Sequence, residues 1–240
     1  MVHNALTYAK EGVFIRIDRW LKLILATLLL AIPMSGYILR IYRGAAPAPE
    51  VEQWGSLCLD GLKLVVISLI YAIPVIIVFL APRLFLHASV KVPVGTVVHQ
   101  GNLDVMGQGI GLILLMMVLA FILELVIAIL LPIASIRFAR TGEFFEAFNF
   151  GAILESIKKI GWLNYILALI LIMIIIGIPI FILEMVFLFC GIMAGHLFYS
   201  LAAFFVVIII IAPPLVVFQA RYLTEVYDSR GPQGQVPSAI

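Results

Sequence analysis

Residues 160–220 read IGWLNYILALILIMIIIGIPIFILEMVFLFCGIMAGHLFYSLAAFFVVIIIIAPPLVVFQA and contain one formal charge, Glu184. A second apolar run, Gly109–Ile136, also contains one charge, Glu124. Soluble domains average about 45–50% apolar and about 25% charged residues. This chain of 240 residues is 64% hydrophobic and 12% charged, with a mean hydropathy of +1.21. The apolar runs therefore predict an all-α, polytopic transmembrane helical bundle.

A spanning helix needs about 20 apolar residues. We predict a single integral membrane domain over 1–228 with about five spans, at about 21–39, 62–81, 109–136, 162–187 and 195–218. The last two spans are separated at Cys190–Gly195, where Gly191 and Gly195 lower helix propensity and also have the spacing of a helix-packing pair. A break at Gly177-Ile178-Pro179 would make six spans, but a proline kink within one helix is favoured. Residues 229–240 are predicted to form a disordered tail.

Amphipathic segments flank these spans. The first, about 5–20, is predicted to lie in the membrane interface and to lead into the first span, with Trp20 on its apolar face and Arg19 on its polar face. The second, Arg137–Lys159, mixes phenylalanines with cations. Its basic residues are candidate contacts for anionic lipid headgroups, or simply anchors on the cytoplasmic side: Arg137, Arg140, Lys158 and Lys159. Between the second and third spans, His87–Gln108 is predicted to be an extended loop or a small hairpin.

The distribution of Lys and Arg gives an expected orientation. With five spans, six of these residues fall on one side of the membrane and nine on the other. The bias favours a cytoplasmic C-terminus, with the first loop and the phenylalanine-rich segment on the same side. A sixth span would place both termini on one side.

Short motifs in the polar segments carry a family resemblance. Gly36-Tyr37 and Arg40 follow the first predicted span, and a loop with Trp54-Gly55 precedes Asp60-Gly61-Leu62-Lys63. Further on comes Gly142-Glu143-Phe144-Phe145-Glu146-Ala147-Phe148-Asn149-Phe150-Gly151-Ala152-Ile153-Leu154. These residues resemble an uncharacterised, largely archaeal family of small polytopic membrane proteins, domain of unknown function 4013. The resemblance implies the fold and topology of that family, and no activity.

Glu124 is the main candidate for a functional site. It lies near the middle of its apolar run, where a charge costs roughly 2.5–3.5 kcal/mol to insert. It is a candidate proton or cation site or an inter-subunit hydrogen bond, or it only helps helices to pack. Glu184 repeats the local string Phe-Ile-Leu-Glu and is a weaker candidate, because it lies nearer the end of its predicted span.

No motif predicts catalysis, a cofactor or a metal site, and a net charge of +2 does not favour nucleic-acid binding. We therefore expect a multi-pass protein of the cell membrane that is not an enzyme. Its expected role is that of an accessory, assembly or scaffold component. Its partners would be membrane lipids and either further copies of itself or a larger membrane complex. A small transporter or channel that uses Glu124 is the main alternative, and a lipid-modifying enzyme is a third.

Overall fold

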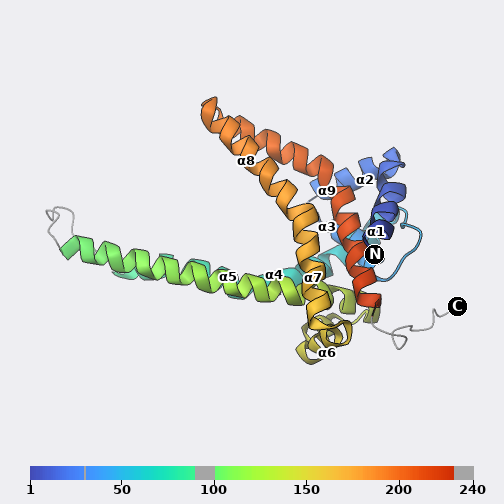
Figure 1. The fold of residues 1–240 in the computed structure, drawn as a ribbon, viewed down its shortest axis with the longest axis horizontal. Coiled ribbons are helices and arrows are strands. Elements are labelled where there is room, and N and C mark those ends of the chain that lie inside the picture. The colour runs from blue at the N-terminus through green and yellow to red at the C-terminus, as the bar shows by residue number, and fades with distance from the viewer. Residues whose placement is uncertain (30, 90–100, 230–240) are drawn as a thin grey trace. The chain divides into compact units, whose positions relative to one another are not determined.

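The structure is a computed structural model that describes residues 1–29, 31–89 and 101–229 (Figure 1). Within these ranges the chain is helical and contains no strand, which confirms the all-α prediction. The α-helices are α1 (Val2–Ala9), α2 (Ile17–Leu28), α3 (Ile32–Tyr42), α4 (Trp54–Ser89), α5 (Gly101–Thr141), α6 (Phe150–Ile160), α7 (Trp162–Ile172), α8 (Ile178–Met193) and α9 (Leu197–Asp228). Two π-helical turns, Lys10–Phe14 and Met173–Gly177, and one 3₁₀ turn, Phe144–Phe148, complete the order.

Four helical segments in the described part of the chain are long and apolar enough to cross a membrane: Trp54–Ala81, Ile113–Thr141, Trp162–Met193 and Leu197–Asp228. The third continues past the predicted end at residue 187, and the fourth continues past residue 218. At Gly177-Ile178-Pro179 the chain makes a π-helical turn and remains helical. A wide turn suits this place, because Pro179 has no N–H to donate to the carbonyl of Ile175.

The first predicted span, 21–39, is not one helix. α2 ends at Leu28, Ala31 has a left-handed φ of 57°, and α3 begins at Ile32. Pro33 explains the break, because it cannot donate to the carbonyl of Leu29 but fits the first turn of a new helix. With 12 and 11 residues, each helix is about 18 Å long and is too short to cross a hydrocarbon core of about 30 Å.

The predicted interfacial helix over 5–20 is also divided. α1 leads into the π-helical turn Lys10–Phe14, and the chain leaves helical geometry at Arg16 before α2 begins. In α2 the exposed side includes Ile17, Leu21 and Leu25. Arg19 is on the buried side with Leu23 and Ala26. The residue predicted to face solvent or headgroups is therefore in the interior.

Both ends of the predicted loop His87–Gln108 are helical, because α4 continues to Ser89 and α5 begins at Gly101. The middle of that loop, 90–100, lies outside the described residues, as do residues 230–240 of the predicted tail. The chain forms two compact units: unit 1 is Met1–Ile67 with Pro132–Ile240, and unit 2 is Ser68–Leu131. Unit 2 contains α4 from Ser68 onward and α5 as far as Leu131.

α9 contacts α1, α2, α3 and α8, and its buried residues lie in its C-terminal half, from Pro213 to Tyr227. Pro213 and Pro214 lie inside α9 and are buried, and Figure 1 shows that α9 bends along its length. Pro214 has no N–H to donate to the carbonyl of Ile210, and the indole Nε1 of Trp20 donates to that carbonyl instead, at 3.0 Å. The α2 helix is thus tied to the place where α9 loses a backbone hydrogen bond.

α8 and α9 form a helical hairpin that turns at Gly195, with φ +68°. Gly191 is buried, and a Cβ atom there would lie 2.7 Å from Cβ of Ser200. The Ser200 hydroxyl donates to the carbonyl of Phe187 on the facing helix. Gly191 and Gly195, the pair singled out in the sequence, therefore allow the close approach and the turn respectively.

α3 and the start of α4 approach backbone to backbone. A Cβ atom built on Gly36 would lie 2.0 Å from the carbonyl oxygen of Leu57, and one on Gly61 would lie 1.8 Å from that of Ile32. Each helix thus places a glycine against a carbonyl of the other, an arrangement that only glycine permits. Gly36 and Gly61 belong to the motifs that carry the family resemblance.

Candidate functional site

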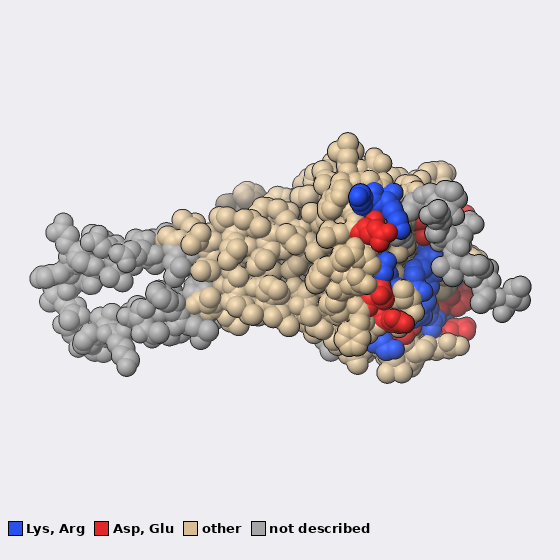
Figure 2. All heavy atoms as spheres, turned by 90° about the horizontal axis from the view of Figure 1, so that it is seen from below, with Lys and Arg blue, Asp and Glu red and all other residues tan. Residues whose placement is uncertain are grey.

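Charged side chains of unit 1 gather into a network that connects α2, α3, α4, α5 and α9 with the loop and the 3₁₀ turn between them. Figure 2 shows Lys and Arg beside Asp and Glu in a band of alternating colour. We call this the polar network. It contains the ion pairs Arg16–Glu50, Arg19–Glu50, Arg43–Asp60, Arg137–Glu146 and Arg140–Asp228.

Arg19 is the most buried member, with a side chain 5% exposed. Its Nη1 donates to the carbonyl oxygens of Gly12 at 3.0 Å and Ala48 at 3.3 Å, and its Nη2 donates to Glu50 Oε1 at 2.5 Å. The planar guanidinium is suited to this role, because it carries five donors in a fixed fork. Arg19 therefore fixes the loop after α3 to the turn that precedes α2.

Glu50 accepts from two arginines, since Arg16 Nη2 also lies 2.8 Å from its Oε1. Hydrogen bonds from Arg16 and then Arg19 hold the pKa of the Glu50 carboxyl below its usual range. Arg40 extends the contact, donating to the backbone carbonyl of Glu50 at 3.3 Å and to the Ser56 hydroxyl at 2.9 Å. This loop is therefore held from both α2 and α3.

Two tyrosines lie beside Arg19. Tyr37 is fully buried, and its hydroxyl and Nε of Arg19 have no hydrogen-bond partner among the described residues. Burial raises the pKa of Tyr37. The Tyr8 hydroxyl donates to the carbonyl of Ala45 at 2.9 Å, and the Arg221 guanidinium lies 4.9 Å from the centre of the Tyr8 ring. Burial raises the pKa of Tyr8 to about 12, with Arg221 opposing the rise.

The second part of the polar network joins the end of α5 to its neighbours. Arg137 pairs with Glu146, and Asn149 both donates to Glu146 at 3.3 Å and caps α6 by accepting from the Ala152 N–H at 3.2 Å. The bond from Arg137, followed by that from Asn149, lowers the pKa of Glu146. Arg140 donates to the carbonyl of Tyr42 at 2.7 Å and to both carboxylate oxygens of Asp228 at 3.0 and 2.8 Å.

The four cations predicted to meet lipid headgroups are thus placed differently. Arg137 and Arg140 are engaged by carboxylates of the chain itself. Lys159 forms an exposed pair with Glu155, one helical turn away, at 2.8 Å. Lys158 is exposed and has no ion pair within the described ranges.

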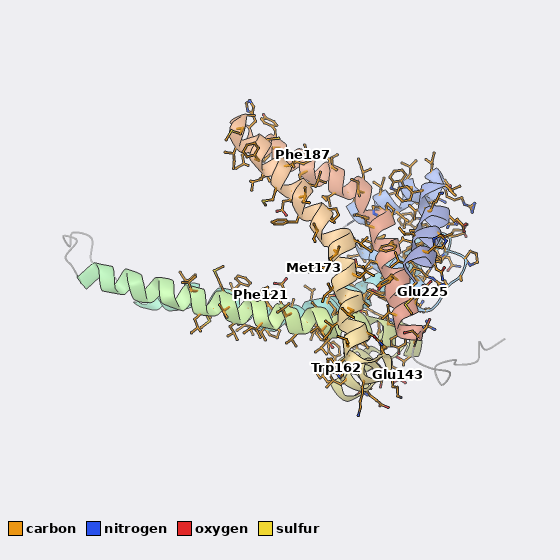
Figure 3. The ribbon with its side chains drawn as sticks, in the orientation of Figure 1. Phe121, Glu143, Trp162, Met173, Phe187 and Glu225 are labelled. Carbon is orange, nitrogen blue, oxygen red and sulfur yellow. The ribbon has the colours of Figure 1, made fainter. Side chains whose placement is uncertain are left out.

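Glu124 and Glu184 are both exposed side chains, and neither is part of the polar network. Glu124 lies on α5 in unit 2, and Glu184 lies on α8 in unit 1. Neither carboxylate forms an ion pair with another described residue. Figure 3 shows the side chain of Phe121, one turn before Glu124, projecting from α5.

The polar network can join elements, because its arginines bridge carboxylates and backbone carbonyls. Among the residues that the structure describes, no three His, Cys, Asp or Glu side chains gather in a geometry that could hold a metal ion. The two cysteines, Cys58 and Cys190, are exposed and free.

Sequence reasoning missed Arg19, Glu50 and Tyr37 as a unit. Arg19 and Glu50 are 31 residues apart, and one sequence contains no signal that pairs them. The one available hint was the run Ala45–Glu50, where small residues and prolines allow the chain to approach α2 closely. Gly12 completes this approach, because a Cβ atom there would lie 2.7 Å from Cβ of Ala48.

Comparison with known proteins identifies the family. A family model described as "Protein of unknown function (DUF4013)" matches residues 21–217. No curated protein and no solved structure matches the chain. The match covers more than half of the chain. It includes the glycine motifs of α3 and α4 and the ion pairs Arg43–Asp60 and Arg137–Glu146 of the polar network, whereas Arg16, Arg19 and Asp228 lie outside the matched residues. The chain therefore belongs to the family of proteins of unknown function DUF4013.

Proposed function

We propose that this protein is a non-catalytic accessory or scaffold component of a complex in the cell membrane. The observation that supports this proposal is that arginines of unit 1 pair with carboxylates of the same chain. Arg19, Arg43, Arg137 and Arg140 each engage a carboxylate of the same chain. Charged side chains in such pairs stabilise the packing of unit 1, and their hydrogen-bonding groups are occupied by the chain itself instead of by a substrate.

The position of Glu124 favours this function over transport. A carboxylate that couples ion movement faces the interior of a bundle or a water-filled cavity. Within unit 2, Glu124 is exposed on α5 and outside the packed side of the helix, a position that suits contact with another membrane segment.

Four spans give a consistent orientation, which we propose in place of five. Among all 15 Lys and Arg residues, two, Arg83 and Lys91, fall between the spans Trp54–Ala81 and Ile113–Thr141. None falls in the turn between the last two spans. The other thirteen belong to the N-terminal segment, the segment between α5 and α7, the C-terminal segment or the adjoining ends of the spans. Cytoplasmic segments carry such an excess of cations, so the polar network lies on the cytoplasmic side.

This orientation predicts that both termini are cytoplasmic. In intact cells, a membrane-impermeant thiol reagent should label a cysteine introduced at His196, in the turn between α8 and α9, from outside. A cysteine at Lys10 or at Ser229 should react only after the cells are opened. The parent is a variant in which Cys58 and Cys190 are replaced by serine. Labelling of Lys10→Cys in intact cells, with Ser229→Cys still protected, would show an odd number of spans and contradict the proposal.

The accessory function itself predicts a stable partner. Gentle solubilisation of native membranes, followed by isolation through a C-terminal tag, should yield one additional membrane protein in fixed ratio. The ratio should persist through size-exclusion chromatography, and a tagged unrelated polytopic protein from the same membranes should not retain that protein. A single monodisperse species that contains this chain alone would contradict the proposal.

A further inference from the structure

The Glu124 carboxylate lies on an exposed part of α5, within a span whose other exposed side chains would contact lipid tails. Glu124 is exposed together with Phe121, which lies on the same side of the helix three residues before it, and with Leu125, the next residue in the chain and one turn after Phe121. Phe121 projects from α5 in Figure 3. Most of the apolar residues of the span Ile113–Thr141 are exposed or only partly buried. Ala120, one turn before Glu124, is buried, but the Glu124 side chain itself lies outside this packed side of unit 2.

Ionisable side chains within membrane segments almost always face other protein or water, because hydrocarbon cannot solvate them. Glu124 is 13 residues before Arg137 on the same helix, a separation of about 20 Å along the axis. That distance is more than a glutamate side chain can span to reach the charged end of α5. Another membrane segment must supply the polar partner.

A second copy of this chain does not fit the role. A symmetric contact through the same face would bring two Glu124 carboxylates together, and like charges oppose ionisation of both. The other spans offer no cation at a matching depth. Trp162–Met193 contains no Lys or Arg, Lys63 lies near the start of α4, and Arg221 lies near the end of α9.

We propose that the Glu124 face of α5 binds a transmembrane helix of a different protein, and that a Lys or Arg within that helix pairs with the Glu124 carboxylate. This inference rests on the proposed accessory function and assigns its contact site. A Lys or Arg in a partner span also costs free energy when it is exposed to lipid. Pairing with Glu124 therefore removes both the cation and the carboxylate from contact with lipid. Phe121 and Leu125 would pack against the partner helix beside the ion pair.

Photocrosslinking tests the contact directly. A photoreactive phenylalanine analogue at Leu125, activated in native membranes, should crosslink to one other membrane protein. Mass spectrometry of the crosslinked peptide should place the attachment in an apolar segment that contains a Lys or Arg. In the Glu124→Leu background the yield should fall about tenfold or more, and Glu124→Gln should give an intermediate yield because it keeps a hydrogen-bonding group without the charge.

Glu184→Leu is the matched control, since Glu184 follows the same Phe-Ile-Leu sequence and is also exposed; it should leave the crosslink unchanged. Crosslinks only to lipid, crosslinks to a second copy, or an unchanged yield in Glu124→Leu would overturn the inference. If the co-isolated partner persists undiminished in Glu124→Leu, the contact site is wrong and the accessory function stands. If wild-type protein has no partner at all, both are wrong.

Discussion

Replacing Gly36 or Gly61 with alanine is expected to destabilise the protein by about 3 kcal/mol or more, the upper end of the cost of overpacking. The added Cβ would lie 2.0 Å from Leu57 O at Gly36 and 1.8 Å from Ile32 O at Gly61. Both obstacles are backbone atoms of a helix and cannot move aside as a side chain can. α3 and α4 would have to separate, which would also disturb Tyr37 beside Gly36. The loss should appear as a lower midpoint temperature of the detergent-solubilised protein, followed by fluorescence-detected size exclusion.

Gly55→Ala is the matched control, because it lies on the same helix as Gly61 and a Cβ there meets nothing within 4 Å. Alanine favours a helix over glycine by up to about 1 kcal/mol. This variant should therefore be as stable as the wild type or slightly more stable. Equal effects at Gly55 and Gly61 would show that helix propensity governs both positions, and that the two helices are not in close contact.

The apolar runs of the sequence were sufficient to predict the helical membrane class, because water cannot solvate so much continuous hydrocarbon surface. They were not sufficient to count the spans. The run at 21–39 has the length of a span, but Pro33 removes one helical hydrogen bond and the chain breaks beside it. Proline inside an apolar run has no single outcome: Pro132 lies within α5, and Pro213 and Pro214 within α9. Trp20, from a distant helix, meets the carbonyl that Pro214 leaves unpaired.

The network was less predictable than the spans, because its contacts join residues far apart in the chain. Periodicity correctly makes α2 amphipathic. The same periodicity places Arg19 on the solvent-facing side of the helix, because it treats every charged residue as solvated. Arg19 is buried because Gly12, Ala48 and Glu50 supply acceptors for it, and these acceptors come from two segments whose approach no local pattern reports. The glycines of the family motifs were visible in the sequence. The carbonyl of the facing helix, which explains why each position must be glycine, was not.

Arg19→Ala is expected to cost about 2–4 kcal/mol, because it leaves the carbonyl oxygens of Gly12 and Ala48 without their donor in a buried place. Arg19→Lys should recover only part of this loss, since one ammonium cannot reproduce the fork that reaches both carbonyls and Glu50. Arg16→Ala is the control. Its side chain is 49% exposed and pairs with Glu50, and exposed pairs contribute little. The midpoint temperature should fall markedly for Arg19→Ala and hardly at all for Arg16→Ala.

The pH dependence provides a second readout of the same contact. The folded state lowers the pKa of Glu50, so its ionisation stabilises the fold fully above the usual glutamate range, and this contribution is lost as the pH falls through the lowered pKa. Wild-type stability should therefore drop on acidification below about pH 4, and Glu50→Gln should show a shallower drop over the same interval. Because the pKa of Glu146 is also lowered, part of the acid sensitivity should remain in Glu50→Gln and become smaller when Glu146→Gln is added. Some of it should persist, because the hydrogen bond from Lys159 lowers the pKa of Glu155 as well. A profile unchanged by Glu50→Gln would mean that Arg19 is held by the two backbone carbonyls alone. In that case Arg19→Ala would still destabilise the protein, but by the same amount at every pH.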